Sequence, residues 1–219
     1  MYDDILLIDK PDGMSSFGVV ARIRRVLSQE AGRKVKVGHT GTLDPFATGL
    51  MILVTGKMCR EAGSFSKLDK TYEATIRLGE VSSTGDPEGE ITALSSQEPT
   101  LEQINDCVKQ FIGVIEQRPP MFSAIKIDGK RAYQLARNGE VVEMPLRTVT
   151  IDSLEVVAYA YPELRIRTDV SSGTYIRTLA QDIGEALGAG AYCSQLRRTR
   201  VGEHTIDAAK TLADFGITS

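Results

Sequence analysis

The sequence predicts an α+β fold with a central mixed, largely antiparallel sheet flanked by helices. Strand-like segments with alternating or continuous apolar patterns are interspersed irregularly with helix-like segments, and several adjacent strands are joined by hairpin signals. The chain has 219 residues, 42% hydrophobic and 25% charged, as is usual for a folded globular protein. We expect one domain over residues 1–219.

Each element is assigned from its periodicity and its flanking turn residues. Ser15 or Ser16 is suited to cap the first helix, whose apolar positions are Phe17, Val20, Ile23 and Leu27. The alternating segment 70–78 places Tyr72, Ala74, Ile76 and Leu78 on one face. The expected strands lie at residues 5–8, 50–54, 70–78, 149–161, 163–170 and 196–200, and the expected helices at about residues 17–27, 57–65, 101–112, 132–138 and 176–187. Residues 171–174 are expected to cap the last of these helices.

Composition excludes several classes of protein. The apolar runs are about five residues long, too short to span a membrane, and the N-terminus is unlike a signal peptide. Three dispersed cysteines argue for a reducing cytoplasm, and two histidines argue against a zinc site of ordinary spacing. We therefore expect a cytoplasmic protein with no metal.

The charge is unevenly distributed along the chain. The net charge is −3, but residues 80–106 contain seven acids and no Lys or Arg, so the other residues carry +4. Residues 83–86 superficially suggest a phosphate-binding loop, which the missing lysine and the neighbouring acids exclude. Residues 82–100 are expected to form a surface loop.

The stretch GHTGTLDPFATG, residues 38–49, concentrates glycine, threonine, histidine and aspartate before a buried strand. Pro45 disfavours helical geometry at Asp44, and glycines allow tight turns or close approach to a ligand. Such loops often present catalytic groups. Taken alone, the stretch is equally consistent with a turn between strands.

Two basic segments allow both a structural and a functional interpretation. The first helix carries Arg22, Arg24 and Arg25, followed by Arg33, Lys34 and Lys36, which is also typical of a solvated helix face. Residues 118–131 combine a hairpin signal at 128–129 with basic, apolar and aromatic residues, an arrangement suited to RNA but also found in ordinary surface hairpins.

Arg177 lies in the first turn of the last helix, where the helix dipole disfavours a cation. Violations of a local rule are expected at functional sites. A nearby anion would offset the unfavourable interaction, and Asp44 is one candidate.

Six motifs together resemble the TruB family of tRNA pseudouridine synthases, and their order and spacing fit that family over almost the whole chain. They are DKPDGMSS at 9–16, GHTGTLDPFATG at 38–49, KTY at 70–72, RPPMFSAIK at 118–126, GTYIRTL at 173–179 and LRR at 196–198. The resemblance implies a pseudouridine synthase fold, no cofactor or metal, and isomerisation of uridine 55 in the T loop of tRNA. The partner is then the T arm of tRNA, and we expect a monomer.

The resemblance also implies roles for individual residues. Asp44 is the essential aspartate, Arg177 its cationic neighbour, and Tyr72 the aromatic residue that stacks on the target base and assists loss of the C5 proton. Tyr175 and Leu196 line the base pocket, and His39 fills the space left by the flipped nucleotide. The possible contacts to the RNA backbone are Lys126, Lys130, Arg131, Arg197 and Arg198.

Residues 118–139 resemble the family's RNA-binding insertion, a basic hairpin followed by a helix. Many relatives also carry a C-terminal PUA-type domain, which we do not expect here, and we place the acidic stretch away from the RNA. An alternative is a tRNA-binding or tRNA-folding protein whose chemistry is dispensable, but an intact Asp44, Tyr72 and Arg177 argue against it. The sequence does not favour a phosphoryl-transfer enzyme, because it has no P-loop lysine.

Overall fold

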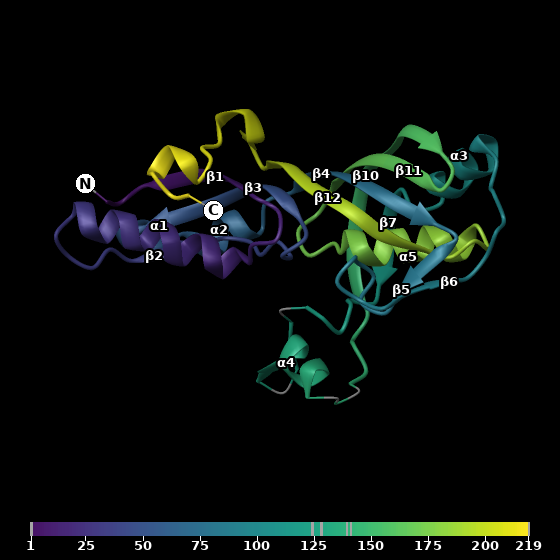
Figure 1. Cartoon of the computed structure of the whole chain (residues 1–219), viewed down its shortest axis with the longest axis horizontal. Coiled ribbons are helices and arrows are strands. Elements are labelled where there is room, and N and C mark those ends of the chain that lie inside the picture. The colour runs from purple at the N-terminus through teal and green to yellow at the C-terminus, as the bar shows by residue number, and fades with distance from the viewer. Residues whose placement is uncertain (1, 124, 128, 139, 141, 219) are drawn as a thin grey trace. The chain divides into compact units, whose positions relative to one another are not determined.

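The computed structural model describes residues 2–123, 125–127, 129–138, 140 and 142–218, and the chain divides into two compact units. The first unit comprises residues 1–72 and 196–219, and the second comprises residues 73–195. Two strands, β4 (Lys70–Leu78) and β12 (Ala191–Val201), contribute residues to both units (Figure 1). The expectation of a single domain over the whole chain stays a prediction.

The elements follow the expected order closely. The remaining strands are β1 (Ile5–Lys10), β2 (Val37–His39), β3 (Thr48–Thr55), β5 (Glu80–Ser82), β6 (Ile91–Ala93), β7 (Gly113–Gln117), β8 (Lys126–Ile127), β9 (Lys130–Arg131), β10 (Arg147–Ala160), β11 (Glu163–Val170) and β13 (His204–Thr205). The α-helices are α1 (Ser16–Glu30), α2 (Ala62–Ser66), α3 (Leu101–Lys109), α4 (Ala132–Arg137) and α5 (Ile176–Ala186), with short 3-10 helices η1 (Gly56–Arg60), η2 (Ile206–Ala208) and η3 (Ala213–Phe215).

The sheet of the first unit is centred on β3. Strands β1 and β2 pair with it in antiparallel fashion, and the last part of β12 pairs with its beginning in parallel, with Arg197 opposite Thr48 and Arg198 opposite Gly49. Leu50, Ile52 and Val201 form a buried cluster on this sheet. The strand expected at residues 50–54 is therefore the centre of the unit that carries the loop 40–47.

The sheet of the second unit is centred on β10 and β11, which pair in antiparallel fashion, and β10 also pairs antiparallel with β7. Strand β4 lies between β11 and β12. Helix α3 packs against β10 and α5. The mixed, largely antiparallel sheet with flanking helices confirms the predicted fold class.

Helix α1 begins where the sequence predicts, because the Ser15 hydroxyl accepts a hydrogen bond from the Gly18 N–H at 3.0 Å. Its buried side contains Val19, Val20, Ile23 and Leu27. Phe17 was predicted on that side, which is wrong: its side chain is 66% exposed. Helical spacing from Leu27 fits Val19, Val20 and Ile23, whereas Phe17 lies on the solvent side of the first turn.

Three further boundaries differ from the predictions. The helix expected at residues 57–65 is divided into η1 and α2, and the loop expected at 82–100 contains β6, which pairs with β5 in a hairpin. Residues 171–174 were expected to cap the last helix, but α5 has Tyr175 at its N-cap and no side-chain cap. Of the helices in the described part of the chain, none has the length and apolar character needed to cross a membrane.

Candidate active site

The loop that carries Asp44 connects β2 to β3 and is held firmly on the side before the aspartate. The Ser16 hydroxyl donates to the Leu43 carbonyl at 2.7 Å and accepts from the Leu43 N–H at 2.8 Å. Ser16 is the first residue of α1 and is buried. One side chain therefore satisfies both polar groups of a buried residue and fixes the peptide that precedes Asp44.

The side after Asp44 is held by Lys10, the last residue of β1, whose side chain is fully buried. Its ammonium donates to the carbonyls of Pro11 at 2.8 Å, Pro45 at 2.9 Å and Ala47 at 2.6 Å. Burial of an ammonium is unfavourable unless its donors are satisfied, and three carbonyls match its three N–H groups. The half-buried Asp44 thus lies between two anchored stretches of backbone.

Gly49, the second residue of β3, has a backbone conformation that side chains rarely adopt and no space for a Cβ. Its φ is +103°, and a Cβ there would lie 2.3 Å from the Arg198 carbonyl oxygen. The glycine is therefore required for β3 and β12 to pair beside the Asp44 loop.

Arg198 was predicted as a possible phosphate contact, and that role stays a prediction. Its side chain is 2% exposed, with Nε donating to the Leu50 carbonyl at 2.7 Å and the guanidinium donating to the Gly41 carbonyl at 3.3 Å. The buried Arg198 side chain therefore connects β3 to the loop that carries Asp44. Arg197 is partly exposed and forms an ion pair with Asp9 at 2.7 Å, so its role as a phosphate contact stays a prediction.

Three other predicted residues also belong to the first unit. Tyr72 is 8% exposed at the end of the first unit's part of β4, and Leu196 is buried at the start of its part of β12. His39 is the last residue of β2, directly before the loop, and is half-buried. The first unit therefore holds Asp44, Tyr72, Leu196 and His39.

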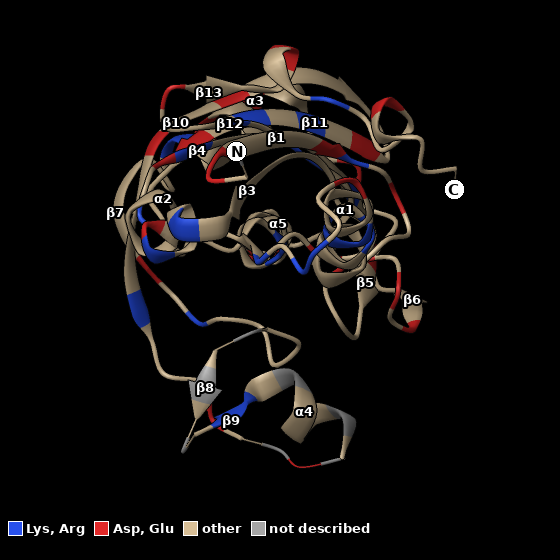
Figure 2. Cartoon of the chain, turned by 90° about the vertical axis from the view of Figure 1, so that its left-hand side faces the viewer, with Lys and Arg blue, Asp and Glu red and all other residues tan. Residues whose placement is uncertain are grey.

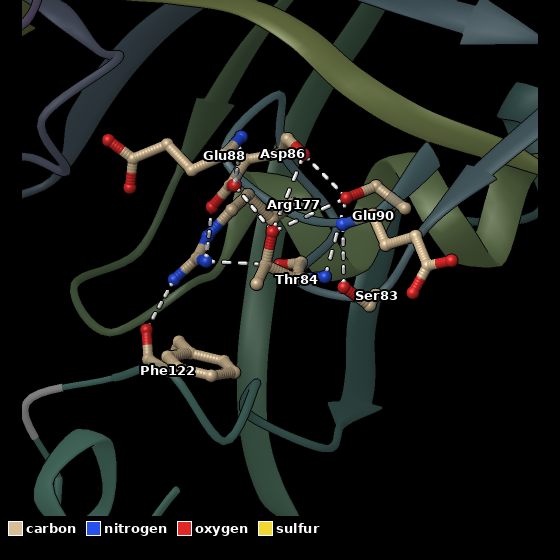
Figure 3. A network of polar contacts seen from close by, with 8 residues as sticks. Ser83, Thr84, Asp86, Glu88, Glu90, Phe122 and Arg177 are labelled. Carbon is tan, nitrogen blue, oxygen red and sulfur yellow. Dashed lines mark hydrogen bonds and ion pairs between the residues drawn. The ribbon is translucent and has the colours of Figure 1, made fainter. Parts of the chain in front are cut away.

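Arg177 lies in the second unit, in the first turn of α5, and is held by a buried ion pair (Figure 3). Its guanidinium lies 2.6 Å from an Asp86 carboxylate oxygen, and the side chains of both residues are 3% exposed. It also donates to the carbonyls of Thr84 at 3.1 Å and Phe122 at 2.7 Å. A cation in the first turn of a helix is thus matched by a carboxylate from a distant loop.

Asp86 is itself oriented by its own loop. Its second carboxylate oxygen accepts from the Thr84 hydroxyl at 2.6 Å and from the Glu88 N–H at 3.0 Å. The acidic stretch 80–106 was expected to lie away from the RNA-facing side, yet one of its acids contacts a predicted catalytic residue. Sequence reasoning missed Asp86 because no local pattern links it to Arg177, 91 positions later.

Tyr175 joins the start of α5 to the predicted RNA-binding insertion. Its N–H donates to the Gln117 side-chain oxygen at 3.0 Å, and the Gln117 amide donates back to the Tyr175 carbonyl at 3.3 Å. The Tyr175 side chain packs against the cluster of Ile125, Ala132 and Met144. Gln117 is a second residue that the sequence did not single out.

The insertion forms the expected hairpin and helix, with β8 paired to β9 and α4 following at once. Lys130 and Arg131 are exposed, and the side chain of Lys126 lies outside the described residues. The proposed pairing of Asp44 with Arg177 joins two units that are described separately, so it stays a prediction. Among the described residues, no three His, Cys, Asp or Glu side chains form a metal-binding group.

Comparison with known families covers nearly the whole chain. Residues 24–176 match the TruB family pseudouridylate synthase (N terminal domain), and residues 177–217 match the tRNA pseudouridylate synthase B C-terminal domain. The chain is 47% identical over 214 residues to the tRNA pseudouridine synthase B of Phocaeicola vulgatus, covering 97% of this chain and 91% of that one. It is 48% identical over 206 residues to the corresponding protein of Parabacteroides distasonis, covering 93% and 88%.

Chains from two solved complexes share the fold. One chain of a Cbf5-Nop10-Gar1 complex matches with a TM-score of 0.74 and 31% identity, covering 97% of this chain and 53% of that one. A chain of an H/ACA RNP bound to a substrate RNA containing 2′-deoxyuridine matches with a TM-score of 0.71 and 30% identity, covering 96% and 51%. The present chain thus spans about half of each of those chains.

Proposed function

The chain belongs to the TruB family of pseudouridylate synthases, and on that premise we propose that it isomerises uridine 55 in the T loop of tRNA with Asp44 as the essential group. The curated relatives named above support tRNA as the substrate. The reaction breaks the C1′–N1 bond, forms a C1′–C5 bond, removes the proton from C5 and places one on N1. No other reactant is needed to balance it.

The observation that carries the proposal is the two-sided anchoring of the Asp44 loop. Ser16 fixes the backbone before the aspartate, and Lys10 fixes the backbone after it. A catalytic carboxylate must be held to within a fraction of an ångström of its working position. A simple turn between strands has no such need for two buried polar side chains, one of them charged.

The electrostatic part of the proposal concerns Arg177. A buried carboxylate tends to take up a proton, and a fixed guanidinium nearby counters that tendency. We assign Arg177 this role toward Asp44 in the substrate complex. The ion pair with Asp86 supports it, because a buried arginine held by a carboxylate and two carbonyls is already oriented when the substrate arrives.

The remaining residues handle the base. We propose that Tyr72 stacks on the target uracil and assists loss of its C5 proton, with Tyr175 and Leu196 lining the pocket and His39 replacing the flipped nucleotide. Extrusion is required because the reacting atoms are inaccessible in a stacked loop. The exposed Lys130 and Arg131, together with Lys126, would contact the RNA backbone from the insertion.

Replacement of Asp44 by asparagine tests the proposal. Asp44→Asn keeps the shape of the side chain and removes its charge, so we expect turnover to fall below detection while tRNA binding stays within a few-fold of wild type. Tritium release from tRNA labelled at uridine C5 measures turnover, and filter binding measures affinity. Asp12→Asn is the matched control, since Asp12 is an exposed aspartate in another loop.

Release at the normal rate by Asp44→Asn would refute the assignment of the aspartate. A wild-type protein that binds tRNA without releasing tritium would instead support the tRNA-binding alternative. Release from tRNA lacking uridine at position 55 would refute the site.

A further inference from the structure

The solvent side of α1 and the segment that follows it carry a dense positive charge. Residues 13–36 contain six Lys and Arg and one acid, Glu30, for a net charge of +5, whereas the whole chain has −3. We call the six side chains the α1 basic surface: Arg22, Arg24, Arg25, Arg33, Lys34 and Lys36. All but the half-buried Arg24 are exposed, and blue segments mark α1 in Figure 2.

The α1 basic surface is not neutralised within the part of the chain that the structure describes. None of its six members forms an ion pair there, whereas Arg77, Arg118, Arg177 and Arg197 each contact a carboxylate. Arg22 donates only to the Gly18 carbonyl at 3.3 Å, in its own helix. Six cations on one short segment repel one another, so an external polyanion would be favoured there.

An exposed aromatic ring accompanies these charges. Phe17 is 66% exposed on the first turn of α1, and the guanidinium of Arg24 lies 6.0 Å from the centre of its ring. Aromatic rings beside cations are the surface on which unpaired bases stack while phosphates are neutralised. An acidic protein segment would use the charges but would leave the ring without a flat partner.

The surface is connected directly to the Asp44 loop. Ser16, which holds both polar groups of Leu43, is the residue before Phe17, and α1 packs against β2, which ends at His39. An RNA strand bound along α1 would therefore be held by the same helix that fixes the backbone before Asp44.

We propose that the α1 basic surface binds the phosphate backbone of the substrate RNA, with Phe17 as a stacking platform for an unpaired base beside it. This inference rests on the proposed function, because it takes tRNA as the ligand. It adds a contact surface on the first unit to the hairpin predicted on the second. Because the Arg198 side chain is buried, β12 offers less exposed charge than the sequence suggested.

The test replaces three exposed members of the surface, Arg22→Gln, Arg25→Gln and Lys34→Gln, in one protein. Each phosphate contact adds about 0.9 to the dependence of log affinity on log salt for duplexes and about 0.7 for single strands. We expect the salt slope for tRNA, measured by filter binding between 50 and 200 mM salt, to fall by about 2. Affinity at the lowest salt should fall at least tenfold, with turnover at saturating tRNA unchanged.

The matched control is Lys67→Gln, Arg165→Gln and Arg167→Gln, which removes the same charge at exposed positions elsewhere. Its salt slope should equal that of wild type. Phe17→Ala provides a separate arm: it should weaken tRNA binding several-fold without changing the salt slope. If the triple variant does not fold, Arg25→Glu alone should still lower both the affinity and the slope.

An unchanged slope in the triple variant, or an equal fall in the control, would overturn the proposal. The proposal would also be overturned, in favour of an acidic protein partner, if the triple variant lost the ability to bind polyglutamate but bound tRNA as wild type does. Failure of the proposed function is distinguishable, because it appears as absent tritium release by the wild-type protein, whatever the salt slopes.

Discussion

At the scale of single residues, the candidate site depends on buried polar side chains whose partners lie far away in the sequence. Arg177 and Asp86 are separated by 91 positions and Ser16 and Leu43 by 27. Asp44 and Arg177, the residues to which we propose to assign the chemistry, could be singled out from sequence, since a glycine-rich loop and a cation in a first helical turn are visible locally. Their supports could not, because tertiary hydrogen bonds leave no local pattern.

Asp86 supplies the first residue-scale prediction. Asp86→Asn keeps the hydrogen bonds from Thr84 and Glu88 within reach but removes the charge that orients Arg177. Breaking a buried ion pair from one side costs about 3 to 5 kcal/mol of stability. We expect kcat to fall at least tenfold and KM to change little, because the role that we propose for Arg177 is in the reaction and not in RNA docking.

Urea unfolding and single-turnover tritium release measure these two effects. Glu90→Gln is the control, since Glu90 is an exposed acid in the same loop. A variant that is destabilised yet turns over normally when folded would show that Asp86 serves stability alone.

At the scale of elements, two adjacent serines at the beginning of α1 make different contacts. Ser15 caps the helix by accepting from the Gly18 N–H, and Ser16 turns the other way to hold Leu43. The sequence alone does not decide which of the two serines caps the helix. In the structure Ser15 bonds to the helix and Ser16 bonds to the loop.

This division predicts different effects for two similar variants. Ser15→Ala should cost about 1 kcal/mol of stability through the lost cap. Ser16→Ala should cost about 1 to 3 kcal/mol, because it leaves a buried N–H and a buried carbonyl unsatisfied. Only Ser16→Ala moves the backbone beside Asp44, so it alone should lower kcat, by about tenfold, with KM unchanged.

Thermal melts measure the stability of the two serine variants, and steady-state tritium release measures their activity. The activities of Ser15→Ala and Ser16→Ala are compared at a temperature where both variants are folded. Equal activity of the two variants would mean that the Leu43 contacts do not position the aspartate.

Most elements were predictable because their signals are local. Alternation identified β4, whose inward row of Tyr72, Ala74, Ile76 and Leu78 is buried as predicted. Helical spacing identified α3 and α5. Phe17 was placed wrongly because helical spacing is least informative in a terminal turn, and the cap of α5 was placed wrongly because the exact end of a helix is uncertain by one or two residues.

At the scale of the whole molecule, pairing between distant strands was the least predictable feature. The parallel pairing of β12 with β3 joins residues 48 and 49 to residues 197 and 198, and neither strand specifies its partner. The division into two units sharing β4 and β12 also has no counterpart in composition. The uneven distribution of charge, in contrast, was predictable from sequence. The acids of residues 80–106 lie in the second unit, and the bases of residues 22–36 lie in the first.

Global stability should depend on pH through a lysine buried at the start of β4. Lys70 is 7% exposed, and its ammonium donates to the Ser66 carbonyl at 2.8 Å and to the Leu68 carbonyl. Burial, together with repulsion from Arg198, lowers its pKa from 10.5 to about 8. The folded protein therefore releases this proton at a lower pH than the unfolded chain does.

The sign of the effect follows from that difference. Between pH 8 and 10.5 the unfolded chain binds more protons at this site than the folded protein does, so Lys70 makes the free energy of unfolding rise with pH in that window. Below pH 8 the unfavourable burial of the charge is fully present. Burial raises the pKa of Cys107, Tyr159 and Tyr192, which acts in the opposite direction at alkaline pH.

Comparison with Lys70→Met isolates the lysine, because the contributions of the thiol and the two phenols are common to both proteins and cancel in the difference. Urea unfolding followed by far-ultraviolet circular dichroism at pH 7, 8, 9 and 10 gives the free energy of each protein. We expect wild type to gain stability relative to Lys70→Met from pH 8 upward. Lys67→Met is the control, because Lys67 is an exposed lysine in the same segment. It shows how much the stability changes when a lysine that is not buried is replaced. A difference between wild type and Lys70→Met that stays constant across this range would show that the ammonium keeps its proton in the folded protein, held by the two carbonyls more strongly than burial opposes it.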